Sequence, residues 1–156
     1  MAALLMGCSG GSALAPGRST EADVRAVMGE PVETRRRADG ETVLWYSREI
    51  PDRAYGRGNY AARIAPDGRL ISVEQRLNDV NIAKLLPDVS RAEDVRDALG
   101  PPHLSYRLRG KEREVWEYQL EGFQRPLTLF VQFSSDQIVH EVFMLERRGV
   151  ASREKR

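Results

Sequence analysis

Two stretches of the sequence, "STEADVRAVMGEPVETRRRADGETVLW" (residues 19–45) and "SRAEDVRDALGPPHLSYRLRGKEREVW" (residues 90–116), align without a gap at a shift of 71 residues. Nine of the 27 aligned positions carry the same residue. A self-match of this length within a chain of 156 residues indicates a tandem duplication of one small module. The duplication decides the fold, because each copy must then contain the same elements.

A short helix opens each copy, and residues at its two ends mark where it begins and stops. Ser90, followed by Glu93, has the spacing of a capping box, and Ser19 begins a looser version in the first copy. Gly29 and Gly100 stand where a helix ends in a residue of positive φ, and a proline two positions later prevents its resumption. Apolar stripes predict the buried helix faces, Val24, Val27 and Met28 in the first copy and Val95, Ala98 and Leu99 in the second.

The residue pattern changes from helical to strand-like after each helix. Asp39-Gly40 and Gly110-Lys111 are hairpin signals at corresponding places in the two copies. The predicted strands cover residues 32–38, 41–49, 60–65 and 70–76 in the first copy and 103–109, 113–120, 127–133 and 138–145 in the second. We therefore predict an α+β fold of two tandem modules, each a short helical segment packed on an antiparallel sheet of about four strands.

Two further features follow from comparing the copies. Residues 79–89 (DVNIAKLLPDV) suit a short extra helix that Pro87 stops, whereas the first copy has small residues at the corresponding place. Trp45 and Trp116 occupy equivalent positions in the ungapped alignment. Both are therefore predicted to pack against the helix of their own module.

The charges of the chain nearly cancel. Lys and Arg number 24 against 23 Asp and Glu, a formal net charge of +1, so no overall field draws the chain to nucleic acid. We expect no nucleic-acid partner. The arginine run 35–37 fits a strand beside a turn, and the alternative is a site for an anionic lipid or an acidic protein surface.

Residues suited to catalysis or metal binding are few. The single cysteine excludes an internal disulfide and a zinc site built from several cysteines. His103 and His140 are the two side chains of a type that titrates near neutrality, and neither has a further ligand at metal spacing. We expect no active site, no metal and no cofactor.

The longest irregular piece between predicted strands of the first copy is "IPDRAYGRGNY" (residues 50–60). Its Arg53, Tyr55, Arg57 and Tyr60 are of the types found at protein contact surfaces, so we take these four as candidate partner contacts. The alternative is a solvated hairpin loop.

The N-terminus contains "LMGC", which resembles the lipobox of bacterial lipoprotein precursors. The resemblance implies that residues 1–7 are the end of a truncated signal peptide and that Cys8 becomes acylated after cleavage. Ser9 matches lipoproteins that are passed on to the outer membrane, and two or more acyl chains give stable anchoring. Residues 8–18 then form a flexible tether of mostly small residues. The alternative is a disordered N-terminus with a chance match.

The repeats resemble the SmpA/OmlA family, the BamE-like small lipoproteins of the outer-membrane assembly machinery. The resemblance is carried by "STEADVRAVMGEP" with "VLWYS", and by "SRAEDVRDALGPP" with "VWEYQ". It implies a helical pair against an antiparallel sheet and a non-enzymatic interaction module. The tandem arrangement is more similar to the beta-lactamase-inhibitor proteins. The expected modules are residues 19–77 and 78–148, followed by a polar tail at 149–156.

The sequence thus predicts a non-enzymatic, lipid-anchored protein on the periplasmic face of a bacterial outer membrane. Its expected partners are outer-membrane lipid, through the acylated cysteine, and envelope or barrel-assembly proteins. The alternative is a soluble periplasmic inhibitor or receptor that binds a protein through the surface between the two modules. A third possibility, an enzyme, rests only on the two histidines.

Overall fold

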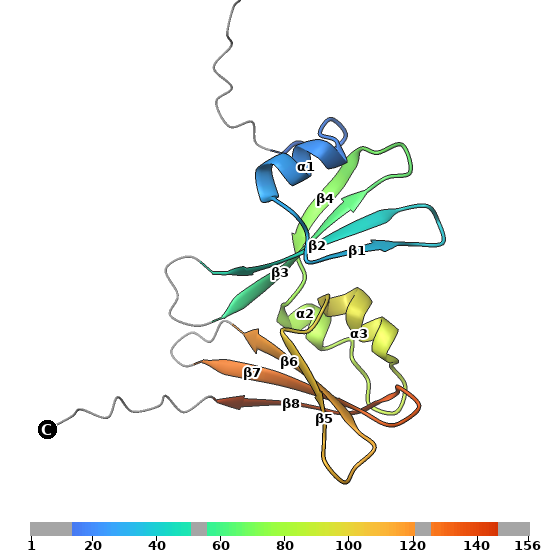
Figure 1. Ribbon diagram of the computed structural model, residues 1–156, viewed down its shortest axis with the longest axis vertical. Helices are drawn as coiled ribbons and strands as arrows, with labels where there is room; N and C mark the ends of the chain where they lie inside the picture. Colours follow the sequence, from blue (N-terminus) through green and yellow to red (C-terminus); the bar gives the residue numbers. More distant parts are fainter. Residues whose placement is uncertain (1–13, 51–55, 121–125, 147–156) are drawn as a thin grey trace, which may run out of the picture.

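The computed structural model describes residues 14–50, 56–120 and 126–146 (Figure 1). Its elements follow the order helix and four strands, then two helices and four strands. They are α1 (Glu21–Met28), β1 (Glu33–Arg36), β2 (Thr42–Glu49), β3 (Arg57–Ile64), β4 (Leu70–Gln75), α2 (Asp79–Ile82), α3 (Ala92–Leu99), β5 (Leu104–Arg107), β6 (Glu114–Leu120), β7 (Leu127–Phe133) and β8 (Val139–Glu146). The predicted α+β fold of two tandem modules is confirmed.

Each module contains one antiparallel meander. The first sheet has the order β1-β2-β3-β4 and the second the order β5-β6-β7-β8. Both sheets have a register shift at the same place, between Arg63 and Ile64 in the first and between Gln132 and Phe133 in the second. Figure 1 shows the elements as a stack, with α1 at one end, the first sheet next, α2 and α3 between the two sheets, and the second sheet at the other end.

The helices begin one residue later than predicted. Thr20 caps α1 in a reciprocal capping box with Asp23, and the Asp94 carboxylate accepts from the Arg91 backbone N–H at the start of α3. Ser90, predicted as the cap, instead accepts through Oγ from the Leu86 N–H. Ser19 does the same for the Ala15 N–H, so both serines hold the turn that leads into the helix.

Each helix packs on its own sheet. Val24 of α1 is fully buried among side chains of the first sheet, and Val95 and Leu99 of α3 are fully buried in the second module. Ala98 and Met28 pack at the margins of these cores, as predicted. Val27 is 58% exposed, so its predicted burial is wrong.

The turn between β5 and β6 is one residue longer than the turn between β1 and β2. The Arg37 N–H donates to the Glu41 carbonyl, whereas the Leu108 N–H donates one residue further, to the Arg113 carbonyl. A shift of one residue moves every following side chain to the other face of a strand. The ungapped alignment therefore fails beyond the hairpin.

The tryptophans show the consequence of this insertion. Trp116 lies in the core of its own module, with its ring centroid 4.7 Å from that of Phe133 and the Arg96 guanidinium of α3 over its face. Trp45 points to the opposite face of its sheet and touches Gly100, in the other module. The prediction that each tryptophan packs on its own helix is confirmed for Trp116 and wrong for Trp45.

Residues 14–18, predicted as the end of the tether, lie against the first module. Leu14 packs on its core, and the Gly17 N–H donates to the Leu70 carbonyl at 2.8 Å. Cys8 and the rest of the predicted signal and tether lie outside the described residues, as does the predicted tail at 149–156. Among the described helices, none has the length and apolar character needed to cross a membrane.

Gly29 and Gly100 offer a matched test of the packing between the modules. Both glycines end a helix with φ near +80° (75° and 84°) and extended ψ, a region that other residues avoid at a cost of about 1–3 kcal/mol. A Cβ on Gly29 meets nothing within 4 Å, whereas one on Gly100 would lie 2.6 Å from the Trp45 ring. Overpacking of this kind costs about 1–3 kcal/mol more.

We predict that Gly100→Ala lowers the free energy of unfolding by about 1–3 kcal/mol more than Gly29→Ala does. Urea unfolding of the two variants and the unchanged chain measures the difference. Equal losses would show that the close approach of Gly100 and Trp45 does not constrain the fold.

Candidate functional site

We call the outer face of each sheet the face turned away from the helix of its own module. On the first sheet it carries Glu33, Arg35, Val43, Trp45, Asn59, Ala61 and Arg63. Helix α3 and the turn after it cover this face. The Arg96 guanidinium contacts the Glu33 carboxylate at 3.1 Å, and Arg76, just after β4, donates to the Ala98 carbonyl at 3.4 Å. The module junction is therefore a helix of one module seated on the sheet of the other.

The side chain of Asn59 makes the central contact of the junction. It is 1% exposed. Its Nδ2 donates to the carbonyls of Leu99 and Pro101, at 2.8 and 3.0 Å, and its Oδ1 lies 3.1 Å from Nε2 of His103. Both amide donors and the amide oxygen are thus used across the junction, which satisfies a polar group that would otherwise be costly to bury.

His103 is a structural residue at this junction. Its Nδ1 accepts from the Gln119 N–H at 2.8 Å, so Nε2 carries the proton and donates to Asn59. Burial, with a smaller effect of the nearby Arg57 charge, lowers the pKa of His103 to about 4. The imidazole is neutral at pH 7 with both nitrogens engaged. His140 lies exposed on β8.

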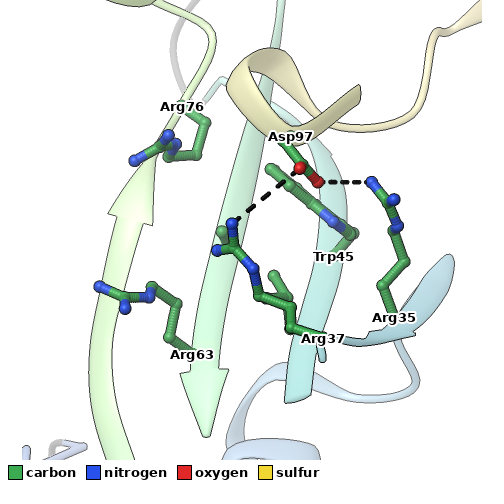
Figure 2. Close-up of a pocket in the computed structure, with 8 residues that line it drawn as sticks. Arg35, Arg37, Trp45, Arg63, Arg76 and Asp97 are labelled. Carbon is green, nitrogen blue, oxygen red and sulfur yellow. Dashed lines mark hydrogen bonds and ion pairs between the residues drawn. The ribbon is translucent and has the colours of Figure 1, made fainter. Parts of the chain in front are cut away.

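An arginine-lined pocket remains beside α3. Asp97 reaches from α3 toward the first sheet, and its Oδ1 lies 2.6 Å from the Arg35 guanidinium while its Oδ2 lies 3.9 Å from that of Arg37 (Figure 2). The Glu41 carboxylate binds Arg63 through two contacts of 2.7 Å. The pocket has a volume of about 230 Å³.

The outer face of the second sheet differs, because no element in the described ranges covers it (Figure 1). Leu104, Tyr106 and Leu145 are 54%, 37% and 55% exposed. Phe130 and Phe143, half-buried neighbours on β7 and β8, stack with ring centroids 5.1 Å apart. Apolar side chains from three of the four strands thus lie on this face, with Glu117 of β6 between Leu104 and Phe130.

A hollow of about 400 Å³ crosses this outer face. Its lining combines apolar and polar side chains: His103, Leu104, Glu117, Gln119, Thr128, Phe130, Leu145 and Glu146. Glu117 stands at the position that Trp45 has in the first sheet, because of the inserted residue in the β5–β6 turn. The face is therefore apolar with acidic groups, where the first sheet presents arginines. We take the outer face of the second sheet as the candidate functional site.

The candidate contacts predicted within residues 50–60 are not brought together in the described part of the chain. Arg57 and Tyr60 belong to β3, so the irregular segment is shorter than predicted. They point to opposite faces of the strand, Arg57 toward the junction and Tyr60 toward the core beneath α1. Arg53 and Tyr55 lie outside the described residues.

Sequence reasoning did not single out Asn59 or the outer face of the second sheet. One signal was available: residues 127–133 and 138–145 carry apolar residues on both alternating faces, in Phe130 and Phe143 as well as in the core positions. A strand with two apolar faces is typical of a sheet covered on both sides. The described structure covers only one of them.

No family model matches the chain, and no curated protein matches it. Among solved structures, a DUF4309 family protein (YjgB) from Bacillus subtilis subsp. subtilis str. 168 aligns with 87% of this chain and 84% of its own, at 18% identity and a TM-score of 0.34. A similarity this low carries no argument about the fold or the function.

His103 makes the stability of the chain depend on pH. Between pH 6.5, its ordinary pKa, and about 4, its pKa in the fold, the unfolded chain binds a proton that the folded chain does not. Stability therefore falls as the pH falls through this range, by about 2–3 kcal/mol, and this contribution is constant above pH 6.5.

We predict that His103→Gln, which cannot titrate, loses this part of the pH dependence. Urea unfolding of both proteins at pH 7 and pH 4.5 measures it, and the common effect of the carboxylates cancels in the difference. If the unchanged chain and His103→Gln lose the same free energy of unfolding between pH 7 and pH 4.5, His103 is not held neutral by the junction.

Proposed function

We propose that this chain is a non-enzymatic protein-interaction module that binds a helical segment of an envelope protein on the outer face of its second sheet. One observation carries the proposal: the equivalent face of the first sheet already holds a helix, α3. The two sheets have the same strand order and the same register shift, so their outer faces offer the same shape of platform. The second platform bears exposed apolar side chains.

The chemistry of the platform indicates what kind of helix it binds. Leu145 follows Phe143 on the same face of β8. Leu104 on β5 lies across Glu117 from Phe130, so these side chains provide apolar contact on both sides of Glu117. Glu117 and Glu141 lie on the same face, on β6 and β8. A complementary helix has an apolar stripe bordered by Lys or Arg.

The proposal places the chain on the periplasmic side of a bacterial outer membrane, held there by lipid on Cys8. The lipobox-like sequence before Cys8 supports the anchor. Leu14 already packs on the first module, so a tether starting at Cys8 has only a few residues between lipid and fold. The barrel-assembly proteins are the envelope partners that we expect. His103 supports the non-enzymatic assignment, since both of its ring nitrogens are engaged in structural hydrogen bonds, one with Asn59 across the junction and one with the Gln119 N–H of its own module.

Photo-crosslinking in the producing bacterium tests whether the outer face of the second sheet binds a helix of another envelope protein. A photoreactive phenylalanine analogue at Leu145 should give one dominant adduct, and mass spectrometry should map it to a helical segment of another envelope protein. The same analogue at Val27, equally exposed but on α1, should not give that adduct. Leu104→Arg should reduce the adduct at least about tenfold without lowering the free energy of unfolding.

Three results would contradict the proposal: equal adducts from both sites, an adduct with a second copy of this chain, or no adduct at Leu145. The anchor is tested in the same cells by labelling with a palmitate analogue. Cys8→Ser should abolish labelling, and unchanged labelling would exclude Cys8 as the lipidated residue.

A further inference from the structure

The pocket at the module junction is a second candidate site, separate from the outer face of the second sheet. Figure 2 shows arginines from the first sheet and from the segment after β4 around Trp45, with Asp97 entering from α3. The pocket is lined by the charged residues Arg35, Arg37, Arg63, Arg76 and Asp97 and by the apolar residues Val43, Trp45 and Ala61.

The arginines of the pocket outnumber the carboxylates that pair with them. Glu41 binds Arg63 at 2.7 Å, and Glu74 binds Arg76 at 2.9 Å. Asp97 is the remaining carboxylate, and it faces both Arg35 and Arg37. Four guanidinium groups thus share three paired carboxylates, and the charge of Asp39 also acts on Arg63.

Arg37 is the arginine of the pocket that has no carboxylate at hydrogen-bond distance. Its guanidinium nitrogens lie 3.9 Å from the Asp97 carboxylate and 3.9 Å from the Glu41 carboxylate, which is longer than a hydrogen bond. The Arg35 guanidinium, in contrast, lies 2.6 Å from the Asp97 carboxylate. The Arg37 side chain is 45% exposed, so an incoming ligand can reach it. Its N–H donors therefore remain available to another acceptor.

The fork of N–H groups on a guanidinium matches the two oxygens of a carboxylate. Asp97 already places a carboxylate among these arginines. The apolar side of the pocket, Val43, Trp45 and Ala61, offers contact to a hydrocarbon or aromatic group. The volume of about 230 Å³ limits the ligand to a small molecule.

We propose that the junction pocket binds a small organic carboxylate, whose oxygens pair with Arg37 and whose apolar body lies against Val43, Trp45 and Ala61. Because the pocket exists only where Asp97 of α3 lies against the first sheet, binding of the ligand stabilises the folded chain. This site does not depend on the proposed function of the second sheet.

NMR titration of the full ¹⁵N-labelled chain tests the pocket, with benzoate as the probe. The indole N–H signal of Trp45, assigned with Trp116→Phe, should shift saturably. Neutral benzamide, of the same shape, should bind at least about tenfold more weakly, a difference of about 1.4 kcal/mol. Inorganic phosphate, which lacks an apolar body, should also bind more weakly than benzoate.

Arg37→Gln should weaken benzoate binding at least about tenfold, and Arg37→Lys, which keeps the charge without the fork, should fall between it and the unchanged chain. Arg36→Gln is the matched control, because Arg36 neighbours Arg37 in sequence but points to the opposite face of β1. It should leave binding nearly unchanged. Urea unfolding confirms that each variant folds.

Three results would overturn the proposal. The first is the absence of a saturable shift with benzoate. The second is equal weakening by Arg36→Gln and Arg37→Gln, which would mean attraction by overall charge. The third is binding of phosphate or benzamide as tight as that of benzoate.

Discussion

The buried amide of Asn59 joins the two modules by three hydrogen bonds, two to carbonyls at the end of α3 and one to His103. An amide at 1% exposure is tolerable only where its donors and acceptor are all used, so its position requires the second module to be in place. The layered order of helix, sheet, helices and sheet depends on this contact. The ion pair of Arg35 with Asp97 and the approach of Gly100 to Trp45 add to it on neighbouring strands.

Local signals in the sequence were sufficient to predict the helices and strands and the duplication. The Asp39-Gly40 and Gly110-Lys111 turns and the glycine stops appear where predicted, and the strands appear in the predicted order with ends that differ by up to three residues. Local signals did not predict which face of a strand or helix is buried. The extra residue in the β5–β6 turn is invisible in an alignment whose tryptophans match, yet it turns Trp116 into the core of its module, whereas Trp45 faces the junction. Val27 is exposed although its spacing predicts burial, since helical spacing does not say which flank of α1 meets the sheet.

The junction itself could not be predicted, because it joins residues whose partners lie in the other module. Asn59 and His103 are 44 residues apart, and neither belongs to a motif. The candidate site on the second sheet could not be predicted for the same reason. A sheet that is covered on both faces in one copy and on one face in the other becomes visible only when the two modules are seen stacked. The two copies have thus diverged in what their outer faces carry, arginines and a tryptophan in one, phenylalanines and acidic residues in the other.

The central claim is that a helix seated on the outer face of the first sheet makes the two modules one folding unit. Native-state hydrogen exchange of the full chain tests it most directly. The account predicts that the slowest amides of β2 and β3 share one free energy of opening with those of β6 and β7, because neither sheet opens without losing the junction. Two distinct values, one for each sheet, would contradict it.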